Sequence, residues 1–161
     1  MLVYLRHGDD RGNDVYRHDR PLNGRGREKA KKRGGRLIEK LGHPDVVYVS
    51  PYRRALETLE VLTTCFEQAV LIRRDPRIAQ HLSEKQRRDP QVSPETHAQV
   101  AIDETREDFQ RRVKLHVEDV RRDQRRVWCV THQAVIEEAA RCIGEEISRD
   151  LDFLDHVILI G

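Results

Sequence analysis

Five short apolar runs, nearly free of polar residues, divide the chain. Continuous runs of this kind are typical of strands that are buried on both faces of a parallel sheet. We therefore predict strands at five places, which are residues 2–5, 46–49, 70–72, 127–130 and 157–160.

Between these runs, apolar residues recur at the spacing of an amphipathic helix. The pattern predicts helices over residues 24–41, 51–66, 102–124 and 133–143. Gly42 and Gly144 follow the first and the last of them, as expected just past a helix end. Alternating strands and helices indicate an α/β fold, a three-layer α/β/α sandwich with a mostly parallel central sheet. The length of 161 residues fits a single domain over residues 1–161.

The stretch 75–101 interrupts this alternation. It contains Pro76, Pro90 and Pro94 and has little periodicity, so we expect a long loop or a broken helix there. Long loops in compact domains are often functional lids.

Composition narrows the classes of function. The 30 Lys and Arg residues nearly balance 28 Asp and Glu residues, which argues against a general nucleic-acid binder. We see no apolar run long enough for a transmembrane helix and no signal peptide, and we expect no membrane partner. Cys65, Cys129 and Cys142 have no C-x-x-C spacing, so we expect buried thiols and a cytoplasmic protein. The basic residues of 24–41 are expected to form a solvated face, or otherwise to steer an anionic partner toward the site.

Polar residues follow three of the predicted strands directly. Arg6 and His7 follow the first run, and the segment Thr131-His132-Gln133 closes the fourth. The second run leads into Ser50-Pro51 and then Arg54. Because ligands bind outside the carboxyl ends of strands in open α/β sheets, we expect these side chains to meet.

The second of these segments resembles the start of a helix. Ser50 is a favourable N-cap residue and Pro51 a favourable first helical residue. The free N–H groups of a helix N-terminus bind anions, and Arg54 in the first turn could grip a phosphate group with two hydrogen bonds.

These residue types suit phosphoryl transfer. A neutral imidazole can attack phosphorus and carry the phosphoryl group as a phospho-enzyme. Two arginines and a second histidine can stabilise the phosphoryl oxygens without a metal ion. The other histidines show no metal-ligand spacing, so we expect no metal and no cofactor.

Four ordered pieces of sequence carry a family resemblance. They are Leu5-Arg6-His7-Gly8 with Asn13, Arg20-Pro21-Leu22 with Gly26 and Ala30, Ser50 to Thr58 with Arg54 and Ala55, and Val130-Thr131-His132. In order and spacing they resemble the histidine phosphatase superfamily, which has the phosphoglycerate-mutase-like fold. The resemblance extends over nearly the whole chain.

The resemblance implies roles for these residues. His7 would be the nucleophile, and Arg6 and Arg54 would bind the phosphate group. His132 would complete the pocket and stabilise the transferring group. Arg53 is the rival of Arg54, although the spacing to Ala55 favours Arg54. We expect the substrate to be contacted further by Asn13, Thr131 and Gln133.

The proton donor is where the chain departs from the family pattern. Most branches have a glutamate where this chain has Gln80, and an amide cannot donate a proton as an acid does. Glu84, His81 or a water molecule could replace it. In length and in the missing acid, the chain is most similar to short bacterial phosphohistidine phosphatases of this superfamily.

Two hypotheses about function follow. The first is a metal-independent phosphatase acting through phosphorylated His7 on a phosphorylated small molecule or a phosphoprotein. The second is a catalytically weak module on the same fold that binds phosphate or serves as a scaffold. A phosphoglycerate mutase is a third, weaker alternative, because the chain is short and lacks the acid. The sequence does not support a nucleic-acid partner and does not indicate an oligomeric state.

Overall fold

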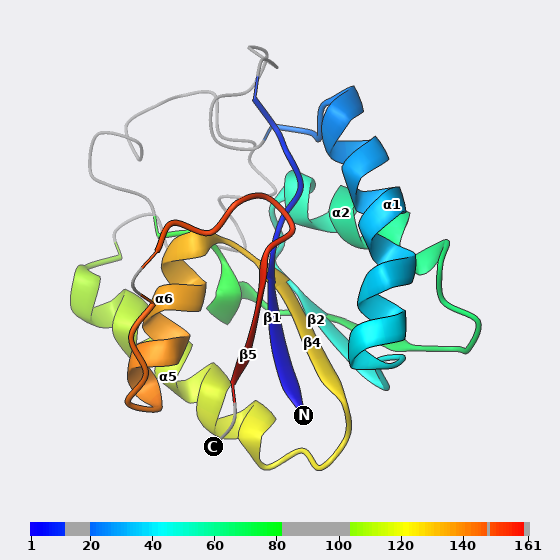
Figure 1. Cartoon of the computed structure of the whole chain (residues 1–161). Helices are drawn as coiled ribbons and strands as arrows, with labels where there is room; N and C mark the ends of the chain where they lie inside the picture. The colour runs from blue at the N-terminus through cyan, green and yellow to red at the C-terminus, as the bar shows by residue number, and fades with distance from the viewer. Residues whose placement is uncertain (12–19, 82–103, 148, 160–161) are drawn as a thin grey trace.

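The computed structural model describes residues 1–11, 20–81, 104–147 and 149–159 (Figure 1). Within them the chain forms a five-stranded sheet in the order β3-β2-β4-β1-β5. β1, β2, β3 and β4 are parallel, and β5 pairs with β1 in the antiparallel sense. The strands are β1 (Leu2–Arg6), β2 (Val46–Val49), β3 (Leu71–Arg74), β4 (Val127–Thr131) and β5 (His156–Leu159).

Helices cover both faces of this sheet. α1 and α2 pack together on one side, and α5 and α6 pack together on the other (Figure 1). The predicted three-layer α/β/α sandwich with a mostly parallel sheet is therefore confirmed. The helices are α1 (Gly24–Leu41), α2 (Arg53–Thr63), α5 (Arg106–Arg121) and α6 (Gln133–Cys142), with a short 3-10 helix η1 (Pro76–Ile78) after β3.

The core consists of two apolar layers, one on each face of the sheet. Val3 and Trp128 belong to the layer beneath α1 and α2. Tyr4 and Cys129, which neighbour them along the strands, belong to the layer beneath α5 and α6. Successive strand residues point to opposite faces, so strands covered on both faces need the continuous apolar runs seen in the sequence.

The third predicted strand differs from the expectation. β3 runs from Leu71 to Arg74 instead of 70–72, and all four of its residues are exposed. It is an edge strand with one hydrogen-bonded neighbour, β2, so an apolar run there does not mean burial on both faces.

The starts of two helices also differ. α2 begins at Arg53, with Tyr52 as N-cap, so Ser50 and Pro51 are not its cap and first residue. α5 begins at Arg106, where Thr105 and Asp108 form a capping box. The predicted long loop after residue 75 begins with η1, and most of its remainder lies outside the described residues.

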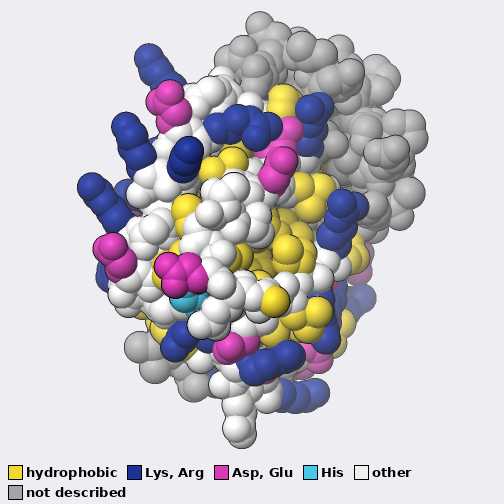
Figure 2. Space-filling view, turned by 90° about the vertical axis from the view of Figure 1, so that its right-hand side faces the viewer, with side chains coloured by type: hydrophobic (Ala, Val, Ile, Leu, Met, Phe, Trp, Pro, Cys, Tyr) yellow, Lys and Arg dark blue, Asp and Glu magenta, His cyan; other side chains and the backbone are white. Residues whose placement is uncertain are grey.

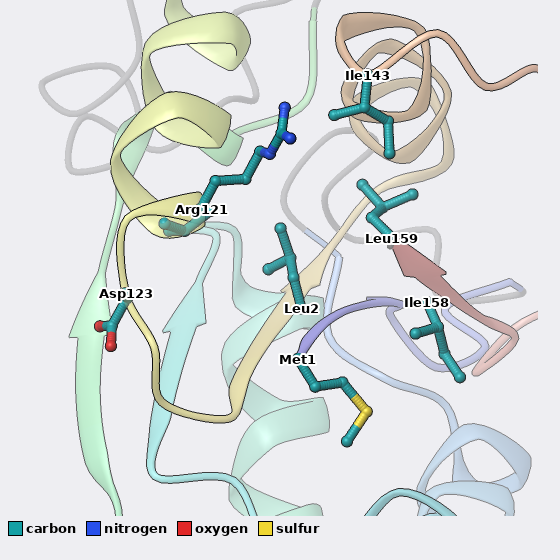
Figure 3. A pocket seen from close by; sticks show the side chains of 8 residues that line it. Met1, Leu2, Arg121, Asp123, Ile143, Ile158 and Leu159 are labelled. Carbon is teal, nitrogen blue, oxygen red and sulfur yellow. The ribbon is translucent and has the colours of Figure 1, made fainter. Parts of the chain in front are cut away.

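The described part of the chain contains no helix long and apolar enough to cross a membrane. Cys65, Cys129 and Cys142 are all free thiols, but only Cys129 is buried, and the expectation of burial is wrong for Cys65 and Cys142, which are partly exposed. A mostly apolar cavity of about 480 Å³ lies where β1 begins, between the ends of α5, α6 and β5 (Figure 3). Met1, Leu2 and Leu159 line it, so it lies at the opposite end of the sheet from the residues that follow the strands. This cavity is therefore distinct from the carboxyl ends of the parallel strands, where ligands bind in open α/β sheets.

Candidate active site

Backbone hydrogen bonds bring three strand ends together. The N–H of His7, just past β1, donates to the carbonyl of Thr131 at 2.9 Å. The N–H of Ser50, just past β2, donates to the carbonyl of Val130 at 3.0 Å. The order β2-β4-β1 thus places the segments beginning at His7, Ser50 and His132 side by side, as the sequence predicts.

His7 is held in one tautomer. Its Nδ1 lies 2.8 Å from the carbonyl oxygen of Gly8, which can only accept, so Nδ1 carries the proton. In the neutral ring Nε2 therefore has a free lone pair. The Nε of Arg54 donates to this Nε2 at 3.1 Å. A nucleophilic nitrogen thus faces a guanidinium group at the place where an anion would bind.

Arg54 lies between the two predicted histidines. Its side chain is almost fully buried, at 3% exposure, and its Nη2 lies 3.2 Å from Nδ1 of His132. Arg53 instead points outward, where its Nε donates to Glu57 at 2.8 Å. The geometry therefore favours Arg54 over Arg53 as the arginine of the site.

His132 is oriented from its other side by Ser50. Since Arg54 donates to Nδ1, the neutral ring carries its proton on Nε2, which lies 2.8 Å from Oγ of Ser50. The rings of His7 and His132 are 5.1 Å apart between centroids. Arg54 thus sets the tautomer of the second histidine, and Ser50, which the sequence suggested as a helix cap, orients its ring.

Both histidines are neutral at physiological pH. Burial, followed by the positive charge of Arg54, lowers the pKa of His7 well below its usual range. Burial and the charge of Arg54 also lower the pKa of His132. The charge of Arg6 acts in the same direction on both rings. The site thus combines unprotonated imidazoles with fixed positive charge, as attack on a phosphoryl group requires.

Arg6 is held by residues after β4 and before β5. Its Nη1 donates to Oε1 of Gln133 at 3.0 Å and also to the carbonyl of Leu151. The amide of Gln133 donates in turn to Glu137 at 2.8 Å. The Thr131 hydroxyl donates to the Ile78 carbonyl at 2.5 Å and is fully buried. In this structure Gln133 therefore orients Arg6, and Thr131 ties β4 to η1.

The position expected for the acid does lie at the site. Gln80 accepts a hydrogen bond through Oε1 from Nη2 of Arg54, the same nitrogen that faces His132. His81 points to Glu104, with Nδ1 3.2 Å from Oε2. Gln80 thus contacts Arg54, whereas His81, the alternative donor that lies within the described residues, is directed to Glu104.

Asp10 is a residue of the site that the sequence analysis missed. It is buried, and its Oδ2 lies 3.7 Å from Nε of Arg54 and 3.4 Å from Nε of Arg20. A carboxylate therefore lies within the cationic pocket. The only hint in the sequence is that Asp10 stands three residues after His7.

Close packing holds the loop after His7 in place. The N–H of Gly8 donates to Oγ1 of Thr58 at 2.9 Å, and that hydroxyl donates to the carbonyl of Arg54 at 2.6 Å. At Gly26 in α1, a Cβ atom would lie 2.3 Å from the carbonyl oxygen of Asp9. Only glycine permits this approach, which explains why the family-like motif includes Gly26.

Two predicted site residues, Asn13 and Glu84, lie outside the described residues. In the part of the chain that is described, no group of three or more His, Cys, Asp or Glu side chains could hold a metal ion. The arrangement of Arg6, His7, Arg54 and His132 is instead suited to a phosphate or another oxyanion.

Comparisons with known proteins bear on the family and the fold of the chain. The sequence profile of the histidine phosphatase superfamily (branch 1) matches residues 2–151. Among solved structures, YhfR from Bacillus stearothermophilus is similar with a TM-score of 0.67 and 23% identity, covering 95% of this chain and 86% of that one. The protein histidine phosphatase SixA complexed with tungstate has a TM-score of 0.60 and 17% identity, with coverages of 86% and 73%. Phosphoserine phosphatase from Entamoeba histolytica has a TM-score of 0.61 and 17% identity, with coverages of 96% and 87%. The comparison with curated proteins gave no match.

Proposed function

The chain belongs to the histidine phosphatase superfamily, and we propose that it is a metal-independent phosphatase acting through a phosphohistidine on His7. The observation that carries this proposal is the contact between Nε of Arg54 and the unprotonated Nε2 of His7 at 3.1 Å. A phosphoryl group entering the pocket would meet the nucleophile and the charge that stabilises its oxygens at the same point.

The reaction has two steps. In the first, the lone pair on Nε2 of His7 forms a bond to phosphorus while the bond to the leaving group breaks, and the leaving group departs with the electron pair. Arg6 and Arg54 balance the charge on the phosphoryl oxygens, and His132 is held beside them by Ser50. In the second step water attacks phosphorus, inorganic phosphate is released and neutral His7 is restored.

The leaving group limits the choice of substrate. Gln80 lies against Arg54 at the place of the family acid and cannot supply a proton. We therefore favour substrates whose leaving group departs readily, and a phosphohistidine is one of them. The name of one structural neighbour, a protein histidine phosphatase, supports this choice, and that of another, a phosphoserine phosphatase, keeps phosphomonoesters as the alternative.

A second candidate function rests on the same glutamine. A module that binds phosphate groups without hydrolysing phosphorylated substrates needs the cations of the pocket but no acid to protonate a leaving group. Such a protein would bind phosphate or vanadate tightly and hydrolyse neither aryl phosphates nor phosphohistidine. Robust hydrolysis of alkyl phosphates would rule it out directly.

The experiment compares His7→Ala with a matched histidine control. His43 lies between α1 and β2, before the amino end of β2, so His43→Ala removes a ring away from the site. Hydrolysis of an aryl phosphate and of a phosphohistidine peptide should be lost in His7→Ala and retained in His43→Ala. Both activities should withstand a metal chelator. Full activity of His7→Ala would refute the proposal.

A further inference from the structure

A groove of basic side chains begins beside the loop that follows His7 and runs along α1. It has a volume of about 430 Å³, and Asp9 and Glu28 are the acidic residues in its lining. Figure 2 views the side of the molecule that carries α1, where Lys and Arg side chains gather along the left border. We define this basic groove by its cations, which are Arg11, Arg25, Lys29, Lys32, Arg33 and Arg36.

Phe153 connects the groove to the active site. The guanidinium carbon of Arg11 lies 5.0 Å from the ring centroid of Phe153, and that of Arg6 lies 4.5 Å from it. The same ring is 5.7 Å from the ring of His7. A molecule whose phosphoryl group reaches His7 can therefore continue past Phe153 into the groove.

Three cations of the groove remain available for a partner. Lys29 and Arg33 are paired with Asp152 and Asp155, at 2.5 and 3.0 Å. Arg25, Lys32 and Arg36 are exposed and have no ion-pair partner within the described residues.

The spacing of the free cations indicates what binds there. Arg25 and Arg36 are eleven residues apart on one stripe of α1, or roughly 16 Å at the rise of an α-helix. An extended polypeptide covers that distance with about five residues. The uniformly charged backbone of a nucleic acid would also meet Asp9 and Glu28, whereas an acidic peptide can place its carboxylates only at the cations.

We infer that the basic groove binds an acidic segment next to the phosphorylated residue of a protein substrate. This inference rests on the proposed phosphatase function and specifies its substrate as a phosphoprotein. Binding would come from electrostatic attraction between charges that are exposed to solvent. The preference for acidic segments should therefore weaken as the salt concentration is raised.

The test uses two phosphohistidine peptides that differ only in flanking residues, with acidic residues in one and neutral residues in the other. The quantity compared is the ratio of kcat/KM for the acidic peptide to that for the neutral one.

Wild type should show a ratio well above one at low salt. The double variant Lys32→Glu, Arg36→Glu should lower this ratio by about tenfold, because two attractions become repulsions. The matched control, Arg106→Glu with Lys114→Glu, reverses two charges on α5 across the sheet and should keep the ratio of wild type. A ratio near one in wild type, or an equal loss in both double variants, would overturn the inference.

A binding measurement distinguishes a wrong inference about the basic groove from a wrong phosphatase proposal. A fluorescent, unphosphorylated acidic peptide should bind wild type and the α5 control at low salt, and the Lys32→Glu, Arg36→Glu variant should lose this binding. If neither phosphopeptide is hydrolysed but the acidic peptide binds as predicted, the phosphatase proposal is wrong and the inference about the basic groove is supported. Absence of binding to wild type, or stronger binding of a single-stranded oligonucleotide of equal charge, would overturn the groove.

Discussion

The carboxylate of Asp10 lies 3.7 Å from Nε of Arg54, inside the pocket that we assign to phosphate. The same nitrogen donates to Nε2 of His7 at 3.1 Å. The carboxylate of Asp10 thus shares the guanidinium of Arg54 with His7, the proposed nucleophile, and an incoming phosphate group must compete with Asp10.

Asp10→Asn should therefore strengthen the binding of inorganic phosphate and vanadate. Removing one negative charge beside the bound anion should lower both inhibition constants about tenfold, or roughly 1.4 kcal/mol. The measurement is competitive inhibition of aryl-phosphate hydrolysis. Asp9→Asn is the matched control, because Asp9 pairs with exposed Arg11 and should leave the constants unchanged. Weaker binding in Asp10→Asn would show that Asp10 mainly holds Arg54 and Arg20 in position.

Gln80→Glu should restore a proton donor. A carboxyl group beside Nη2 of Arg54 could protonate an alkoxide leaving group, so kcat/KM for an alkyl phosphate should rise at least about tenfold. Aryl-phosphate hydrolysis should change far less, since a phenolate leaves without a proton. Gln80→Met removes the amide without adding an acid and should not improve either substrate. An equal change for alkyl and aryl phosphates in Gln80→Glu would contradict this account.

Two buried histidines of the site, His7 and His132, should make stability depend on pH. Their pKa values are lowered in the folded protein, while an unfolded chain has ordinary values near 6.5. Below about pH 6.5 the unfolded state therefore binds more protons, and the free energy of unfolding falls as pH falls toward the lowered values. Each histidine contributes a slope of up to about 1.4 kcal/mol per pH unit.

Urea unfolding between pH 7.5 and 5 measures this slope. Aspartates with lowered pKa values, such as Asp9 at about 2, lose their contribution only below this range, so the histidines dominate the change. His132→Asn should make the slope shallower. A slope as steep in His132→Asn as in wild type would mean that His132 is protonated to the same extent in the folded and unfolded states.

Much of the site could be predicted because it depends on strand order and chain direction alone. Arg6, His7 and His132 stand at the ends of apolar runs, and parallel strands bring such ends to one edge of the sheet. The sequence predicts Ser50 as a helix cap, which is wrong because Tyr52 is the N-cap of α2. The hydroxyl of Ser50 instead meets His132, which is 82 residues away in the sequence, and local sequence cannot reveal that contact.

Other features depend on tertiary contacts that leave no local pattern. An Asp in a loop is typical of a turn, and only the folded structure shows that Asp10 points to Arg54 and Arg20. The exposure of β3 follows from its place at the edge of the sheet, which a run of apolar residues does not encode. The charge pattern of 24–41 suggests a solvated face or an anionic partner. Only the fold shows that the basic groove along α1 reaches the active site past Phe153.

Trapping the phospho-enzyme tests the central claim most directly. The enzyme is mixed with a substrate carrying a radiolabelled phosphoryl group, quenched in base within milliseconds and mapped by peptide sequencing. The account predicts one base-stable, acid-labile label on His7 in wild type and in His43→Ala, and none in His7→Ala. A label on another residue, or turnover by wild type without any labelled His7, would contradict it.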